Sequence, residues 1–171
     1  MAATYRVIGR EILLGANKSL LALFNGVGSS NVLKVNRIWL LNNQLAAITG
    51  ILVTLELRLI TAHTIGTLVT PAKSKLASPN LDANVVSSMG ATVTETSLFR
   101  RIVWSADEPA QTENTMDTLE LMPSINIIWD SGYSGSSVES LILNAGQGVH
   151  IKCVTSTVAS NLGNIIMEFT T

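Results

Sequence analysis

The best candidate for chemistry in this chain is a ten-residue stretch from Asn144 to Cys153, which reads Asn-Ala-Gly-Gln-Gly-Val-His-Ile-Lys-Cys. It holds two glycines, one of the two histidines and the single cysteine. A cysteine thiolate beside an imidazole can act as a nucleophile with its base. A Gly-X-Gly turn can bind phosphate when it leads into a helix. Both kinds of site depend on the element that carries the residues.

The pattern after Gly148 predicts a strand, because apolar and polar side chains alternate over Val-His-Ile-Lys-Cys. Successive side chains on a strand point to opposite faces of a sheet, so His150 and Cys153 point apart and form no catalytic pair. We expect Cys153 to be buried as a small apolar residue. We expect His150, with Lys152 on the same face, to be exposed or to lie at an interface. The two glycines then form a hairpin turn.

Other catalytic patterns in the sequence are incomplete. Gly132-Tyr133-Ser134-Gly135 falls short of the Gly-X-Ser-X-Gly motif of serine hydrolases, and no strand-to-helix turn is predicted around it. One cysteine and two histidines make no zinc cluster, and the acidic residues lack the regular spacing of a calcium loop. We therefore predict no catalytic residue, no metal site and no cofactor.

The elements that position these residues follow a period of two, which is typical of strands with one packed face. The clearest runs are Gly50–Thr61 and Thr118–Trp129. A single short helix is expected at Gln44–Ile48. Further strands are expected at Lys18–Phe24, Val32–Leu41, Thr64–Thr70, Ala91–Thr96, Leu98–Ser105, Val138–Leu143, Val149–Thr155 and Ile165–Phe169.

Many short strands and little helix predict an all-β chain, an antiparallel two-sheet β-sandwich with a jelly-roll-like topology. We expect one domain over residues 1–171, with residues 1–17 as an N-terminal arm. Trp104 and Trp129 share the parity of the apolar core positions, so both are expected in the core.

Three apolar residues stand at positions where the alternation points outward, and we expect them at an interface: Met122, Ile128 and Ile166. Tyr133 lies in a Gly/Ser-rich loop and is the aromatic residue that we expect to be exposed. Four acidic residues, Asp107, Glu108, Glu113 and Asp117, lie in a loop-like stretch without Lys or Arg between them. They form either a solvated loop or a contact loop for a basic partner surface.

The composition narrows the class of protein. Charged residues make up 13% of the chain, about half of the roughly 25% in an ordinary soluble domain, so copies can pack closely with little repulsion. The net charge is −1 and no basic stripe supports nucleic-acid binding. Residues Ile38–Leu55 are uncharged but contain Asn42-Asn43-Gln44, whose amides are costly in a bilayer. We therefore expect no membrane span, and the first residues lack the apolar segment of a secretion signal.

Two pairs of segments resemble small virion structural proteins of tailed bacteriophages. The first pair is Lys18-Ser-Leu-Leu-Ala-Leu-Phe-Asn-Gly-Val-Gly-Ser-Ser and Val35-Asn-Arg-Ile-Trp-Leu-Leu-Asn-Asn-Gln. The second is Phe99-Arg-Arg-Ile-Val-Trp-Ser-Ala-Asp-Glu-Pro-Ala and Gly146-Gln-Gly-Val-His-Ile-Lys. The resemblance covers most of the chain and implies a β-sandwich subunit of the particle, with no catalytic residue to transfer.

On this basis the first expectation is a capsid decoration or cement subunit, made in the host cytoplasm and located in the virion. It would form a homo-oligomer, with a trimer as the first expectation, and contact a major capsid or tail protein. The alternatives are a tail or fibre component, or a carbohydrate- or receptor-binding module with Tyr133 near the loop Asn25–Asn31. An enzyme of the cupin or glycosidase type would need a pocket lined by Glu56, Glu120 or His150.

Overall fold

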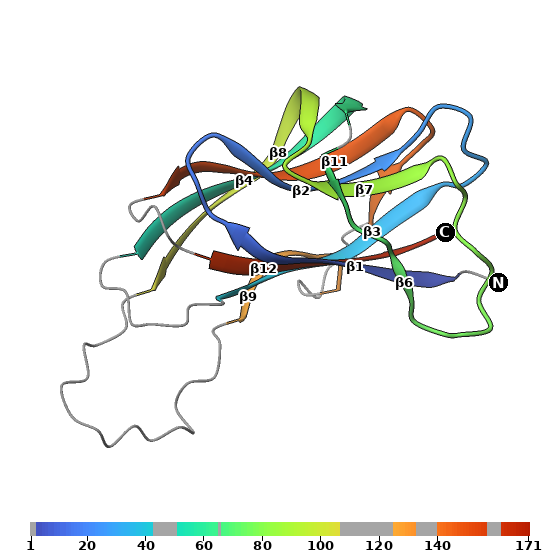
Figure 1. Ribbon diagram of the computed structural model, residues 1–171, viewed down its shortest axis with the longest axis horizontal. Helices are drawn as coiled ribbons and strands as arrows, with labels where there is room; N and C mark the ends of the chain where they lie inside the picture. The colour runs from blue at the N-terminus through green and yellow to red at the C-terminus, as the bar shows by residue number, and fades with distance from the viewer. Residues whose placement is uncertain (1–2, 43–50, 65, 107–124, 133–139, 157–161) are drawn as a thin grey trace, which may run out of the picture.

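A computed structural model describes residues 3–42, 51–64, 66–106, 125–132, 140–156 and 162–171 of the chain. Within these ranges the chain forms strands in two antiparallel sheets that lie face to face (Figure 1). This confirms the predicted antiparallel β-sandwich. No helix long and apolar enough to cross a membrane occurs in the described ranges.

The strands are β1 (Thr4–Leu13), β2 (Lys18–Asn25), β3 (Leu33–Asn42), β4 (Ile51–Thr64), β5 (Thr67–Leu68), β6 (Ala72–Lys73), β7 (Val85–Met89), β8 (Thr92–Ala106), β9 (Ile125–Asp130), β10 (Leu141–Leu143), β11 (Gln147–Ser156) and β12 (Leu162–Thr170). Sheet A has the order β10-β3-β12-β1-β6, and β9 also pairs with β3. Sheet B has the order β5-β7-β2-β11-β4-β8.

The long strands pair in a nested series. The first, β1, pairs with the last, β12; β2 pairs with β11; β3 pairs with β9 and β10; and β4 pairs with β8. A long hairpin rolled up on itself gives this series, which is the topology of a jelly roll. Strands β9 and β10 lie end to end along β3 and act as one interrupted strand.

The core lies between the two sheets and is built by alternation. On β12, Ile165, Met167 and Phe169 are completely buried, while the residues between them are partly exposed. Tyr5 on β1 stacks on Phe169 with ring centroids 5.6 Å apart, and its hydroxyl donates a hydrogen bond to the Pro79 carbonyl. The two tryptophans predicted in the core are buried, with Trp104 5% and Trp129 8% exposed.

Two predictions about the elements differ from the structure, and two more fall largely on residues outside the described ranges. The expected N-terminal arm is a strand from Thr4 to Leu13, because its alternation places Tyr5 and Val7 in the core and β12 pairs along its length. The separate strands predicted around Ser97 are one strand, β8, and β7 was not predicted. The expected helix Gln44–Ile48 and most of the run Thr118–Trp129 lie outside the described residues.

A bulge in β9 corrects the predicted outward position of Ile128. Trp39 pairs with Ile127 and Ile38 pairs with Trp129, so Ile128 is the extra residue of the bulge. The bulge brings both Ile128 and Trp129 into the core, with 1% and 8% of their surface exposed, and turns Ile127 outward. Ile128 is therefore a core residue and no interface candidate.

Candidate functional site

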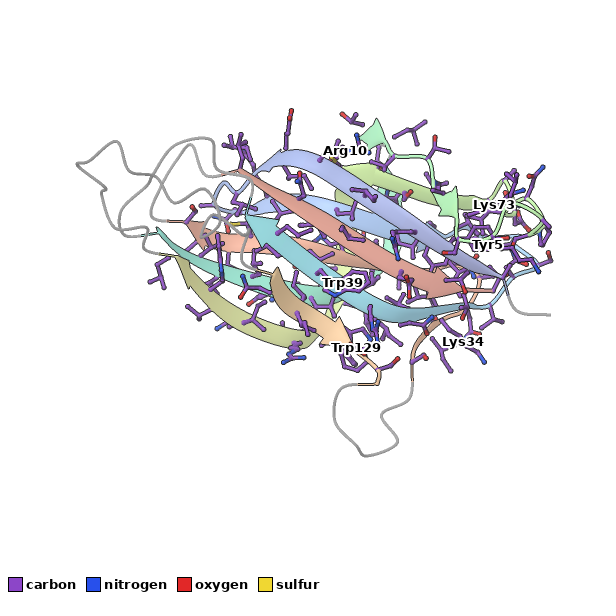
Figure 2. All side chains as sticks on the ribbon, turned by 90° about the horizontal axis from the view of Figure 1, so that it is seen from below. Tyr5, Arg10, Lys34, Trp39, Lys73 and Trp129 are labelled. Atoms are coloured by element: carbon purple, nitrogen blue, oxygen red, sulfur yellow. The ribbon has the colours of Figure 1, made fainter. Side chains whose placement is uncertain are left out.

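The outer face of sheet A carries a row of four large apolar side chains, one on each of four neighbouring strands. Ile8 on β1 lies opposite Ile166 on β12, Ile166 lies opposite Trp39 on β3, and Trp39 lies opposite Ile127 on β9. Each side chain keeps part of its surface exposed, because it alternates with neighbours that fill the core. We refer to these four residues as the Trp39 band. Figure 2 looks onto this face, with Trp39 near its centre.

The next row on the same face consists of four charges of alternating sign. Arg6, Glu168, Arg37 and Asp130 lie opposite one another in that order on β1, β12, β3 and β9. Arg6 Nη2 lies 2.9 Å from Glu168 Oε2, and Arg37 Nε lies 2.9 Å from Asp130 Oδ2. We refer to these residues as the ion-pair row. Partly exposed pairs of this kind stabilise a fold by only about 0.2–1 kcal/mol, so their main effect is the charge pattern that the face presents.

Both arginines also lie against Trp39 and join the two rows. The guanidinium carbons of Arg6 and Arg37 are 6.0 Å and 5.9 Å from the centre of the Trp39 ring. A cation in this position over an indole gains about 0.5–1 kcal/mol at an exposed site. The two arginine side chains remain 47% and 48% exposed. Tryptophan and arginine are the residue types that contribute most to protein–protein contacts, so the face has the chemistry of a docking surface.

Of the Trp39 band, the sequence identified only Ile166 as an outward apolar residue. The signal for Trp39 lies in the local pattern, since Ile38 and Leu40 on either side of it are completely buried. What no pattern could show is that Ile8, Ile166, Trp39 and Ile127 are neighbours, because their strands are far apart in sequence. That information comes from the pairing of the strands.

A second group of polar residues lies on the outer face of sheet B, beneath an arch formed by the end of β4 and the start of β8 (Figure 1). His63 near the end of β4 reaches β7, where its Nε2 lies 2.8 Å from Ser88 Oγ, and its ring stacks on Phe24 of β2. The arch therefore crosses β11 and β2. It covers a small apolar cluster that contains Ala22, Ile60 and Ala91.

This arch corrects the prediction that His150 is exposed or at an interface. His150 points to the outer face as expected, but only 1% of it is exposed. Its Nδ1 lies 3.0 Å from Ser19 Oγ, and its Nε2 lies 3.5 Å from Glu95 Oε1 without a hydrogen bond. Burial lowers the pKa of His150 to about 4, more than the nearby Glu95 carboxylate raises it. The imidazole is therefore neutral near pH 7.

The charges around His150 are paired with one another. Lys152 Nζ lies 2.8 Å from Glu95 Oε1, and Arg58 lies 3.1 Å from Glu95 and 2.5 Å from Glu56. Arg101 pairs with Glu56 as well. Burial would raise the pKa of Glu56, but the hydrogen bonds and charges of the two arginines lower it below its usual value. These carboxylates serve as ion-pair partners, and the enzymatic roles considered for Glu56 and His150 gain no support from their surroundings.

Cys153 lies on the opposite face of β11 from His150, as the strand parity predicted. It is completely buried, and burial raises the pKa of its thiol to about 11. Its Sγ donates to the Thr155 carbonyl at 3.5 Å. The thiol is therefore protonated at neutral pH, and among the described residues no base lies beside it, since His150 is on the other face; the pair of Cys153 and His150 is excluded.

The other sequence-predicted interface residues divide into two groups. Lys152 is half-buried in its ion pair with Glu95, and Ile166 lies in the Trp39 band. Six more interface predictions lie outside the described residues: Asp107, Glu108, Glu113, Asp117, Met122 and Tyr133. Glu120, which the enzyme alternative would use, also lies outside them.

Two open hollows lie elsewhere on the molecule. One of about 300 Å³ is lined by residues that include Tyr5, Lys73 and Asp82, and one of about 270 Å³ by residues that include Arg10, Glu11 and Ser19. Of the residues that the structure describes, a single carboxylate lines each hollow, whereas glycoside hydrolysis uses a pair. Across the described ranges, His, Cys, Asp and Glu form no group of three or more that could hold a metal ion.

Comparison with protein families, with curated proteins and with solved structures finds no match to this chain.

Proposed function

We propose that this chain is a non-enzymatic virion structural protein, a capsid decoration or cement subunit that stabilises the particle by self-association and by contacts with a major capsid or tail protein. The single observation that carries the proposal is the outer face of sheet A. There the Trp39 band and the ion-pair row combine apolar area, arginines and tryptophan on one face of the sheet. These are the components of a protein interface with an apolar centre and a polar rim.

The composition and the fold class support the same proposal. A surface with few charges and many hydroxyl and amide groups lets copies approach closely. Jelly rolls occur in viral capsid proteins as well as in lectins and cupins, so the fold is compatible with a virion part and does not by itself select it.

The location of the chain tests the proposal directly. Particles purified from the source culture are labelled with a gold-conjugated antibody against this chain and viewed in the electron microscope. We expect regular label over the head of the particle. Label confined to the tail would assign the chain to a tail or fibre, and label absent from particles but present in the cell lysate would refute a virion role.

A second candidate function, binding of a carbohydrate or receptor, is favoured by the partly exposed indole of Trp39 on a sheet face. Sugar rings stack on such rings, but here two guanidinium groups already occupy the surroundings of the indole. A glycan array of the wild type and of Trp39→Ala separates the two functions. Binding of a defined glycan that is lost in Trp39→Ala would support the second candidate, whereas an array without signal would remove it.

A further inference from the structure

We propose that the outer face of sheet A docks on the same face of a second copy of this chain, across a two-fold axis that runs parallel to the strands between β12 and β3. The inference deepens the proposed function and rests on it in one respect, namely that this face is an interface. It replaces the trimer expected from the sequence with a two-fold dimer as the first unit of assembly.

The order of charges in the ion-pair row carries this inference. From β1 to β9 the row reads Arg6, Glu168, Arg37, Asp130, which is plus, minus, plus, minus. A two-fold axis between β12 and β3 reverses the row on the second copy. Arg6 then faces Asp130 of the second copy, and Glu168 faces its Arg37. Every charge in the row meets an opposite charge, and the symmetry produces each contact twice.

The Trp39 band fits the same operation. Reversed across the axis, Ile8 faces Ile127 of the second copy and Ile166 faces its Trp39, so apolar side chains meet along the whole band. The half-exposed arginines stand on one side of this apolar strip and can reach the carboxylates of the second copy. Two twisted sheets that pack face to face in this way cross at a small angle, as the sheets of a β-sandwich do.

A two-fold axis that lies in the plane of the face and runs across the strands gives no such match. An axis along the Trp39 band reverses the direction of every strand in the second copy. Each charge of the ion-pair row would then face the residue that lies on the other side of the band, on the same strand of the second copy. Glu168 would then face Asn164 of the second copy, and Arg37 would face its Leu41, since these residues continue the outward side of β12 and β3. A charge buried against an amide or an apolar side chain is unfavourable. The charge pattern therefore selects the axis between β12 and β3.

The size of the face suits a reversible dimer. Strands β1, β3 and β12 have nine or ten residues and β9 has six, and together they cover about 570 Å² at ~4.8 Å between strands and ~3.4 Å per residue. Standard interfaces bury about 800 Å² on each partner. We therefore expect a dimer that dissociates on dilution, so that its equilibrium can be measured.

Charge reversal with mixing tests the arrangement. Within one chain, Arg6 and Asp130 are three strand spacings apart, about 14 Å, which exceeds the screening length of about 8 Å at physiological salt. Arg6→Glu and Asp130→Lys each place like charges opposite each other at both symmetric contacts of the dimer. An equimolar mixture of the two variants forms a heterodimer in which the two substituted side chains, a carboxylate and an ammonium, face each other. At the other contact of that heterodimer, the native Arg6 faces the native Asp130.

Self-association is measured by light scattering over a dilution series, and each variant is first checked by thermal unfolding. We expect a wild-type dimer, dissociation constants raised at least about tenfold in each variant, and recovery to within about threefold in the mixture. Arg100→Glu on β8 of sheet B is the matched control and should dimerise like the wild type. If Asp130→Lys fails to fold, Arg37→Glu mixed with Glu168→Lys repeats the test, because the same axis places those two residues opposite each other.

A mixture that stays as dissociated as its components would overturn the inference, and so would single variants that dimerise normally or a wild type of trimeric mass. A wild type that is monomeric at every concentration would also overturn it. In that case the proposed function stands if gold label still decorates the particle, and it fails separately if the particle carries no label.

Discussion

At the scale of single residues, burial decides the protonation states of His150 and Cys153, the two side chains that the sequence offers as candidates for catalysis. The β4–β8 arch covers His150, and burial keeps its imidazole neutral even though Glu95 lies 3.5 Å away. Cys153 on the other side of β11 is held as a thiol by the core. Neither residue is poised for catalysis, and both contribute to packing. Their titration nevertheless makes measurable predictions.

Replacement of His150 by Gln should flatten the dependence of stability on pH. The folded pKa of about 4 lies below the ordinary value of 6.5, so between these values the unfolded chain binds a proton that the folded chain does not. The stabilisation that comes from the neutral imidazole is therefore fully present above pH 6.5. It is lost as the pH drops toward 4, which lowers the free energy of unfolding by on the order of 3 kcal/mol. Urea unfolding at pH 7, 6 and 5 measures this loss.

The matched control is His63→Gln. Burial lowers the pKa of His63 as well, so the unfolding free energy of this variant should depend less on pH than that of the wild type. The unfolding free energy of His150→Gln should depend on pH less still. The Glu95 carboxyl also loses its ion pairs on protonation, but its pKa is lowered, so its contribution disappears only below about pH 4.5 and is common to all variants. Equal slopes in the wild type and in His150→Gln would contradict the burial of the imidazole.

The thiol of Cys153 should resist alkylation in the folded protein. Its pKa of about 11 leaves very little thiolate at pH 8, and the side chain has no exposed surface. Mass spectrometry after iodoacetamide treatment should find the native chain unmodified and the urea-unfolded chain fully labelled. Rapid labelling of the native chain would place Cys153 outside the core.

At the scale of elements, the sequence pattern identifies some strands of the two sheets well and misses others. The sequence pattern located β2, β3, β4, β11 and β12 well. On β12 buried and partly exposed side chains alternate along the whole strand, whereas on β2 the four residues from Leu20 to Leu23 are all buried. The pattern failed at β9, where a bulge at Ile128 changes the parity within three residues. It also failed at β1, since Arg10 and Glu11 interrupt the alternation at a second bulge, where Glu11 has φ = 52°.

Strand β1 is an integral part of sheet A, and Tyr5→Ala tests this. Removal of a fully buried aromatic side chain that also donates a hydrogen bond to Pro79 should cost about 3–5 kcal/mol of unfolding free energy. Thr4→Ala, at a partly exposed position of the same strand, should change it by less than about 0.5 kcal/mol. Similar small effects for both would indicate that residues 4–13 are an arm that the fold does not need.

At the scale of the whole molecule, the fold class follows from local pattern but the candidate site does not. Period-two alternation and turn-rich segments predict packed antiparallel sheets, because a sheet with one apolar face must bury that face against another sheet or by closing on itself. The composition of the outer face of sheet A depends on which strands are neighbours. Ile8, Trp39, Ile127 and Ile166 meet only because the first and last strands pair and β3 lies beside them. The arch over His150 was missed for the same reason.

The central claim is that the outer face of sheet A is the surface through which copies of this chain meet, and oxidation of Trp39 by hydroxyl radicals tests it most directly. The three tryptophans provide their own controls, since Trp104 and Trp129 are buried in a single copy. As the concentration rises through the range in which light scattering reports association, oxidation of Trp39 should fall several-fold while that of Trp104 and Trp129 stays low. Unchanged oxidation of Trp39 in a protein that has demonstrably associated would show that another surface makes the contact.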